Sequence, residues 1–180
     1  DMTKSFYDLL RAVMYGSKPK IAVVKGLALG GGCELIAFCD IVYASEKARF
    51  GQPEINVGVF PAPAVAIFPK LLGLKKTYEL ILTGDMISAT EAERIGLINK
   101  VFPHEDLEKE VDKLTANLCA KSSVVLQLTR KAILRAKDMD VEKAMAWSGD
   151  IYEGELMNTE DAHIGIEAFL AQKKPVWKNM

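Results

Sequence analysis

The chain has 180 residues, enough for one well-formed domain, and a chain of this size buries roughly 70% of its unfolded surface on folding. Apolar residues make up 49% of the sequence and charged residues 26%, which excludes an intrinsically disordered protein. The net charge is −1, so there is no basic excess of the kind that binds nucleic acid, and the longest apolar stretch is too short to span a membrane.

The first part of the chain alternates between helix and strand. Hydrophobic periodicity, glycines and prolines predict these elements in chain order: a helix over 3–15, a buried strand over 21–24, a helix opened by the glycines at 30–32 that runs to about 38, strands over 41–44 and 48–50, and a loop over 51–54. A strand, a glycine turn and a helix followed by more strand indicate an α/β architecture.

Helices dominate from Pro63 onward. The run Ser88-Ala89-Thr90-Glu91 has the pattern of a capping box, and Gly96 ends the helix that it starts. The remaining elements are a strand over 97–102 and helices over 105–119, 123–136, 141–156 and 160–171. We therefore expect an α/β core over 1–103 and a helical region over 104–180.

Three features carry the candidate chemistry. Gly30-Gly31-Gly32 lies between a strand and a helix, where free backbone N–H groups can bind an anion or a developing oxyanion. The alternative is a tight turn without a ligand, and the spacing does not match a dinucleotide fingerprint. Glu34 is either an exposed first-turn residue or a semi-buried acid/base. Glu54, in a proline-fixed loop with apolar neighbours, could join it in general acid/base work on a carbonyl compound.

The cysteines and histidines predict no metal or redox site. Cys33, Cys39 and Cys119 form no CxxC pair and no closed disulfide set, so we expect reduced thiols of a cytoplasmic protein. His104 and His163 are expected at the surface.

Longer motifs resemble those of the enoyl-CoA hydratase/isomerase (crotonase) family. The matching runs are Ala28-Leu29-Gly30-Gly31-Gly32-Cys33-Glu34-Leu35, Cys39-Asp40-Ile41, Phe50-Gly51-Gln52-Pro53-Glu54-Ile55, Leu82-Thr83-Gly84-Asp85, Ala92-Glu93-Arg94-Ile95-Gly96-Leu97-Ile98 and Ala168-Phe169-Leu170-Ala171-Gln172-Lys173-Lys174-Pro175. Together they cover nearly the whole chain.

The resemblance implies a spiral of ββα units with a helical C-terminal region that assembles trimers or hexamers. It implies an acyl-CoA substrate, with coenzyme A as part of that substrate and no separate cofactor or metal. Gly31 matches the oxyanion-hole residue whose N–H holds the thioester oxygen. Glu34 and Glu54 match the two hydratase glutamates, of which Glu54 delivers a proton to C2 and Glu34 helps to activate water. The presence of both favours hydration of a conjugated C=C over isomerisation.

Two departures from the family pattern affect the substrate site. Pro61-Ala62-Pro63 stands where many members have a glycine-rich segment, and together with Gln52 it is expected to line the acyl pocket. Similar segments occur in the family's cyclic dienoyl-CoA hydratases of aromatic degradation. In the tail, Phe169 matches an aromatic that meets CoA across a subunit boundary, and Lys173 stands one place after the usual lysine.

Members of the family also carry residues before the first helix seen here, including strands and a second oxyanion N–H. We therefore expect that this sequence lacks those parts. Two alternatives to the hydratase stay open: a CoA-thioester isomerase or hydrolase of the same fold, and a non-catalytic assembly fragment.

Overall fold

A computed structural model describes residues 2–180, so Asp1 lies outside the described part. The chain forms two compact units, one of residues up to 16 with 20–113, and one of residues 17–19 with 114–180. Within the described residues, no helix is long and apolar enough to cross a membrane. The division into a 1–103 core and a 104–180 helical region stays a prediction.

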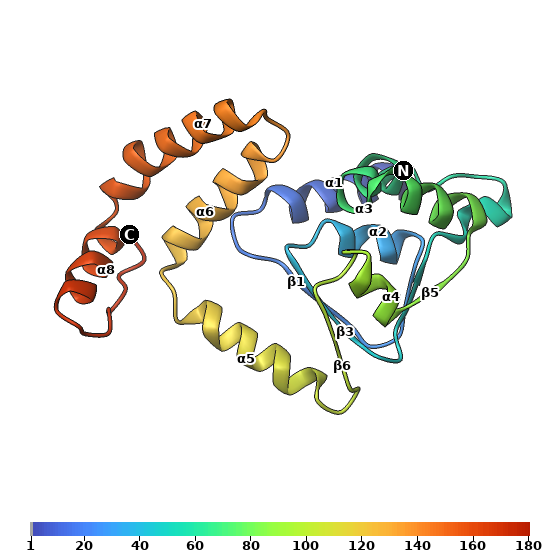
Figure 1. The fold of residues 1–180 in the computed structure, drawn as a ribbon, viewed down its shortest axis with the longest axis horizontal. Helices are drawn as coiled ribbons and strands as arrows, with labels where there is room; N and C mark the ends of the chain where they lie inside the picture. The colour runs from blue at the N-terminus through green and yellow to red at the C-terminus, as the bar shows by residue number, and fades with distance from the viewer. Residues whose placement is uncertain (1) are drawn as a thin grey trace. The chain divides into compact units, whose positions relative to one another are not determined.

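The first unit combines helices with short strands (Figure 1). Its elements are α1 (Met2–Tyr15), β1 (Ile21–Val24), β2 (Leu27–Leu29), α2 (Gly31–Ala37), β3 (Ile41–Ser45), β4 (Arg49–Gly51), the 3-10 helix η1 (Pro53–Val57), α3 (Ala62–Thr83), β5 (Ile87–Ser88), α4 (Ala89–Arg94), β6 (Lys100–Phe102) and the start of α5 (Leu107–Cys119).

The strands form two three-stranded sheets. In the first, β3 lies between β1 and β6 and is parallel to both, with Ile21 opposite Ile41 and Tyr43 opposite Lys100. In the second, β4 lies between β2, to which it is parallel, and β5, to which it is antiparallel. The mostly parallel pairing with helical crossovers confirms the predicted α/β class.

Three local predictions differ from the structure. Strands β2 and β5 were not predicted, because runs of three and two residues are too short to show an alternating pattern. The predicted strand over 97–102 shortens to Lys100–Phe102, since the amides of Leu97 and Ile98 both donate to the Ala92 carbonyl at the end of α4. The expected loop after β4 enters η1 at Pro53.

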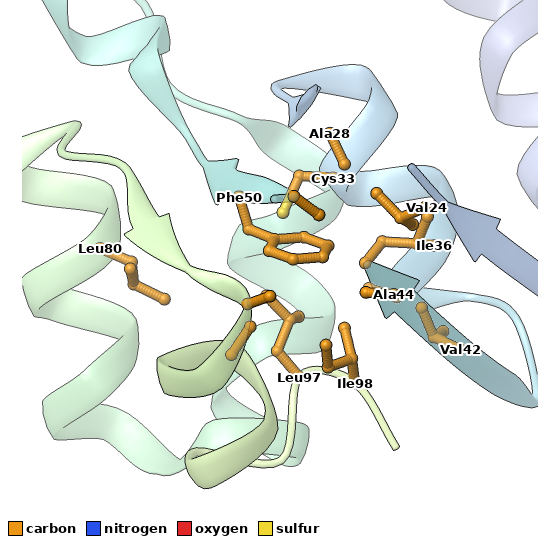
Figure 2. Packing of buried hydrophobic residues seen from close by; sticks show 14 of the residues in the cluster. Val24, Ala28, Cys33, Ile36, Val42, Ala44, Phe50, Leu80, Leu97 and Ile98 are labelled. Carbon is orange, nitrogen blue, oxygen red and sulfur yellow. The ribbon is translucent and has the colours of Figure 1, made fainter. Parts of the chain in front are cut away.

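Apolar side chains from both sheets and three helices build the core of this unit. Figure 2 shows the Phe50 ring at its centre, with Cys33 and Ile36 of α2 on one side and Leu97 on another. Phe50 is fully buried, as is Phe68 of α3. Truncating such a side chain to alanine typically lowers the free energy of unfolding by about 3–5 kcal/mol. Packing of this strength holds the end of β4 and the start of α2 in place.

The second unit is helical. It contains the end of α5, α6 (Ser123–Ala136), α7 (Val141–Gly154), the 3-10 helix η2 (Leu156–Asn158) and α8 (Glu160–Leu170). The helices begin where the sequence predicts, because Ser122, Asp140 and Thr159 each accept a hydrogen bond from a first-turn amide. Helix α6 packs against both α7 and α8.

A polar cluster ties the C-terminal segment to this helical unit. The Asp161 carboxylate, at the start of α8 and 1% exposed, accepts hydrogen bonds from the amides of Lys178 (2.7 Å) and Asn179 (3.0 Å). The Asn179 side chain in turn accepts from the Ser123 amide, and the Trp177 indole donates to the Ala120 carbonyl. We call this arrangement the Asp161 clasp.

Candidate active site

The parallel pairing of β2 with β4 brings two sequence motifs together. Ala28 lies opposite Phe50 and Leu29 opposite Gly51, so both strands end at the same edge of the sheet. The Gly30 amide then donates to the Gly51 carbonyl at 3.0 Å, one step beyond the ladder. As a result, the glycine turn that follows β2 and the Gln52–Glu54 segment that follows β4 lie side by side.

Gly30 allows the closest approach within this pair of turns. Its φ of 53° and ψ of −125° fall in a region that residues with a side chain rarely adopt. A Cβ at this position would lie 2.6 Å from Oε1 of Glu54. The Glu54 carboxylate therefore packs directly on the Gly30 backbone, and only glycine fits there.

Gly31 is the first residue of α2, where amides have no partner within the helix. Its α-carbon faces the ring of Phe6 from α1, because a Cβ on Gly31 would meet the Cζ atom of Phe6 at 3.4 Å. An aromatic ring thus lies beside the proposed oxyanion position, a neighbour that the sequence analysis did not connect with the glycines.

Glu34 is buried rather than exposed, with 4% of its surface accessible. Its Oε1 accepts a hydrogen bond of 3.0 Å from the Ala64 amide in the first turn of α3. Burial raises the pKa of the Glu34 carboxyl, the Ala64 hydrogen bond lowers it, and the Glu54 charge raises it, so the pKa lies above its usual range. Glu34 is therefore not an exposed first-turn residue, and its role as an acid/base stays a prediction.

Glu54 lies in the first turn of η1, directly after Pro53. Its main chain is fixed by a hydrogen bond from the Val59 amide to the Glu54 carbonyl. Its Oε1 lies against Gly30, whereas its Oε2 is buried without a partner among the described residues. One carboxylate oxygen is thus held by packing, and the other is left to bind something else.

Cys33 lies close to both glutamates. Burial raises the pKa of its thiol to about 12, a backbone hydrogen bond from Gly51 acts in the opposite direction, and the charges of Glu54 and Glu34 add to the rise. The thiol is therefore neutral and unreactive at physiological pH. Its position shows that α2 and the end of β4 share one acidic neighbourhood.

Gln52 is completely buried, and neither amide atom has a hydrogen-bond partner in the part of the chain that the structure describes. An unpaired buried polar group costs about 1–3 kcal/mol, and most buried groups avoid that cost. Gln52 was predicted as a pocket residue, and this unpaired amide is the feature that sequence reasoning could not foresee.

The predicted pocket wall forms the beginning of α3. Pro61 is its N-cap, Ala62 its first residue and Pro63 its second, and both prolines are buried. The Ala64 amide has no helix carbonyl to bond and donates to Glu34 instead. The start of α3 and Glu34 are therefore joined by a hydrogen bond. This bond could have been anticipated from the sequence only by placing the first turn of α3 next to Glu34.

Phe169 and Lys173 belong to the helical unit. Phe169 lies on α8 and is 81% exposed, and Lys173 follows the helix, where its amide donates to the Ala168 carbonyl. Their predicted contact with the CoA of a neighbouring subunit stays a prediction.

The two histidines, His104 and His163, are both exposed, as predicted. Nδ1 of His104 lies 3.0 Å from the Ser45 hydroxyl oxygen.

Comparison with known proteins supplies the family. The family model described as enoyl-CoA hydratase/isomerase matches residues 1–180. The chain belongs to this family. It is 34% identical to a probable mitochondrial enoyl-CoA hydratase of Dictyostelium discoideum, over 99% of this chain and 63% of that protein. It is 38% identical to a crotonyl-CoA hydratase of Syntrophomonas wolfei, over 92% of this chain and 64% of that protein. The chain thus spans less than two thirds of these relatives.

Solved structures confirm the crotonase fold. An enoyl-CoA hydratase of Mycobacterium smegmatis superposes with a TM-score of 0.92 and 32% identity, covering 98% of this chain and 68% of that one. An enoyl-CoA hydratase structure from Geobacillus kaustophilus gives a TM-score of 0.92 and 36% identity, covering 99% of this chain and 69% of that one. The family resemblance expected from the motifs is therefore confirmed.

Proposed function

We propose that the protein adds water across the conjugated C=C of an enoyl-CoA thioester. The observation that carries this proposal is the pair of glutamates that flanks the glycine turn, Glu34 bonded to the start of α3 and Glu54 packed on Gly30. Family membership and the named hydratases among its relatives support the same reaction. A thioester substrate brings its own coenzyme A, so the proposed chemistry needs no further cofactor.

The proposed reaction divides the work among three residues. The Gly31 amide donates to the thioester oxygen while that oxygen gains enolate character. A new bond forms between the water oxygen and C3 as a water proton passes to Glu34, and C2 receives the proton of Glu54. Proton exchange between the carboxyls or with solvent restores the starting state. The hydroxyl group at C3 and the proton at C2 arrive from the same side of the double bond, which gives syn addition.

The electrostatics of Glu34 bear on its role as a base. Burial and the nearby Glu54 charge raise the pKa of Glu34, so this carboxyl holds a proton to higher pH than an isolated glutamate does. In its ionised form Glu34 is therefore a stronger base toward water, because an effective catalytic base has a pKa near the working pH.

We expect Glu54→Gln to abolish hydration without unfolding the protein. Loss of a general acid costs about 10²–10⁴ in rate, and glutamine keeps the shape that packs on Gly30. The assay follows the absorbance of the conjugated thioester, with Glu46→Gln, an exposed glutamate of the same unit, as the matched control. Unchanged turnover by a folded Glu54→Gln enzyme would contradict the proposal.

A finer part of the proposal concerns the acyl group. Buried Pro61 and Pro63 make the start of α3 stiff, and such a wall fits a ring, as in a cyclic dienoyl-CoA, better than a flexible chain. A poor fit of one methylene changes the free energy of the transition state by about 1–3 kcal/mol, so the preference is graded. A kcat/KM for crotonyl-CoA well above that for every cyclic dienoyl thioester would reject it.

We further propose that the protein assembles as a homotrimer or hexamer in the cytoplasm. Support for assembly comes from apolar side chains of the helical unit that are exposed in the single chain, among them Phe169, Leu170 and Val176. Sedimentation of the purified protein tests the assembly, and a monomer at micromolar concentration would contradict it.

A further inference from the structure

The stretch after β4 concentrates unpaired buried polar atoms. Among the described residues, four buried side-chain nitrogen or oxygen atoms have no partner, and three of them belong to Gln52 and Glu54. The fourth is the Trp147 indole nitrogen in the helical unit. Because buried polar groups are nearly always paired, this clustering within three positions indicates a local purpose.

The unpaired atoms do not result from a loose loop. The Gly51 carbonyl accepts from the Gly30 amide, and the Glu54 carbonyl accepts from the Val59 amide. The main chain is therefore tied on both sides of Gln52. The surrounding structure holds the two side chains in place and leaves their polar atoms without protein partners.

An apolar side chain of the same size would fit the Gln52 position without this cost. Replacing buried polar groups by apolar groups of similar shape is often neutral or stabilising. A glutamine kept in a fully buried position is thus a feature that folding alone does not explain, and such positions commonly serve a site.

We propose that Gln52 is a positioning residue of the site, whose amide holds a buried water that hydrogen-bonds to Oε2 of Glu54. The Gln52 Nε2 group donates to this water, and the water donates to Oε2 of Glu54, so Oε1 carries the proton for C2. Buried waters typically need two to four polar partners, which these two side chains can supply. Packing on Gly30 fixes one oxygen of Glu54, and the water fixes the other.

This inference rests on the proposed hydratase chemistry, in which Glu54 transfers a proton to C2. A carboxyl held at both oxygens has one orientation, whereas a carboxyl held only by packing can rotate. Misplacement of a reacting group by about 1 Å can cost roughly 10²-fold in rate. Gln52 therefore acts through Glu54 and does not itself touch the reacting carbons.

The test compares Gln52→Met with the wild type. We expect kcat to fall by roughly tenfold or more with KM within about twofold, because the orientation of Glu54 is lost and binding is not. The midpoint of thermal unfolding is expected to stay level or rise. Gln127→Leu, a half-buried glutamine on α6, is the matched control, and Gln52→Leu serves where the methionine variant does not fold.

A second readout follows the Glu54 carboxyl directly. Its 13C NMR resonance is recorded at one fixed pH and assigned through Glu54→Gln. A carboxyl that loses a hydrogen-bond donor changes its chemical shift, so the resonance in Gln52→Met is expected to move. A merely structural glutamine would leave this resonance in place.

Three results separate the possible failures. Absence of hydration by the wild type overturns the proposed function, while the carboxyl resonance still tests the link between Gln52 and Glu54. Unchanged kcat and an unchanged Glu54 resonance in Gln52→Met overturn this inference alone. A kcat loss that only follows a lower unfolding temperature, with the Glu54 resonance unmoved, overturns it as well.

Discussion

The two units treat buried polar groups in opposite ways. In the helical unit, Asp161 is as buried as any core residue, yet its carboxylate accepts hydrogen bonds from two backbone amides of the C-terminal segment. In the α/β unit, Gln52 and one oxygen of Glu54 are buried with no partner among the described residues. The fold satisfies the buried carboxylate of Asp161, so the unpaired polar atoms after β4 support our proposal of a site there.

The two units also differ in how much apolar surface each one buries. The α/β unit holds a continuous core around Phe50 and Phe68, whereas Ile151 is the one apolar residue that the structure shows as buried within 114–180. Stability of the first unit comes from apolar burial, which offsets the cost of its unpaired polar atoms. The second unit has fewer buried apolar side chains and includes directed hydrogen bonds such as those of the Asp161 clasp.

The largest expected effect comes from breaking the contact between the glycine turn and Glu54. Gly30→Ala would place a methyl group 2.6 Å from Oε1 of Glu54, in a backbone conformation that alanine rarely adopts. We expect kcat to fall about 10²-fold through displacement of Glu54, and stability to drop by about 1–3 kcal/mol. Enzyme assays and denaturant unfolding measure the two effects.

Gly26→Ala is the matched control for Gly30→Ala. Gly26 is an exposed glycine between β1 and β2 at which an added Cβ would meet no atom within 4 Å. We expect near wild-type activity and stability. Equal losses of activity and stability in both variants would show that these losses do not depend on the contact between Gly30 and Glu54.

A smaller effect is expected from breaking the Asp161 clasp. Asp161→Asn places an amide NH₂ against backbone donors, so we expect the unfolding temperature to fall by roughly 5 °C, with Asp150→Asn, an exposed residue of α7, as control. Activity of the folded fraction is expected to stay unchanged. A loss of activity without a loss of stability would contradict the separation of roles between the units.

The clasp also has a defined pH dependence. Burial alone would raise the pKa of Asp161, but the hydrogen bonds from Ser122, Lys178 and Asn179 outweigh it and hold the pKa below its usual range. A carboxyl with a lowered pKa contributes stability above its unfolded pKa and loses it as pH falls through the folded pKa. The helical unit is therefore expected to weaken only in acid, below the ordinary range of aspartate.

Glu34→Gln is expected to have the smallest effect on stability, and this effect has the opposite sign. The pKa of Glu34 is raised, mainly by burial, so its ionised form destabilises the fold as pH rises through that pKa. Glutamine can still accept from the Ala64 amide, and we expect a gain of about 1 kcal/mol at pH 7 that disappears in acid. Equal stability of the two proteins at every pH would contradict a buried, strained carboxyl.

Much of the fold could be predicted from local signals. The helix from Ser123 to Ala136 and the strand from Ile21 to Val24 have the predicted bounds, because capping residues and apolar runs mark them. Strand β2 was missed, since its three residues gain stability from pairing with β4 rather than from their own pattern. The strand predicted to begin at Leu97 begins at Lys100 instead, because the amides of Leu97 and Ile98 donate to the Ala92 carbonyl at the end of α4.

The site was predicted by resemblance and only partly by pattern. Motif spacing placed Glu34 and Glu54 near the glycines, and the parallel pairing of β2 with β4 explains why. The hydrogen bond from the Ala64 amide to Glu34 joins residues that are 30 positions apart in the chain. The unpaired amide of Gln52 results from the way the interior packs around it. No local sequence signal reports either of them.

One measurement tests the central claim, that the two glutamates beside the glycine turn add water to a conjugated thioester. Purified protein is incubated with an enoyl-CoA in H₂¹⁸O, and the product is identified by mass spectrometry. The account predicts a 3-hydroxyacyl-CoA that carries one ¹⁸O at C3, formed by the wild type and lost in Glu54→Gln. An isomer of unchanged mass, free coenzyme A, or equal labelling by Glu54→Gln would contradict it.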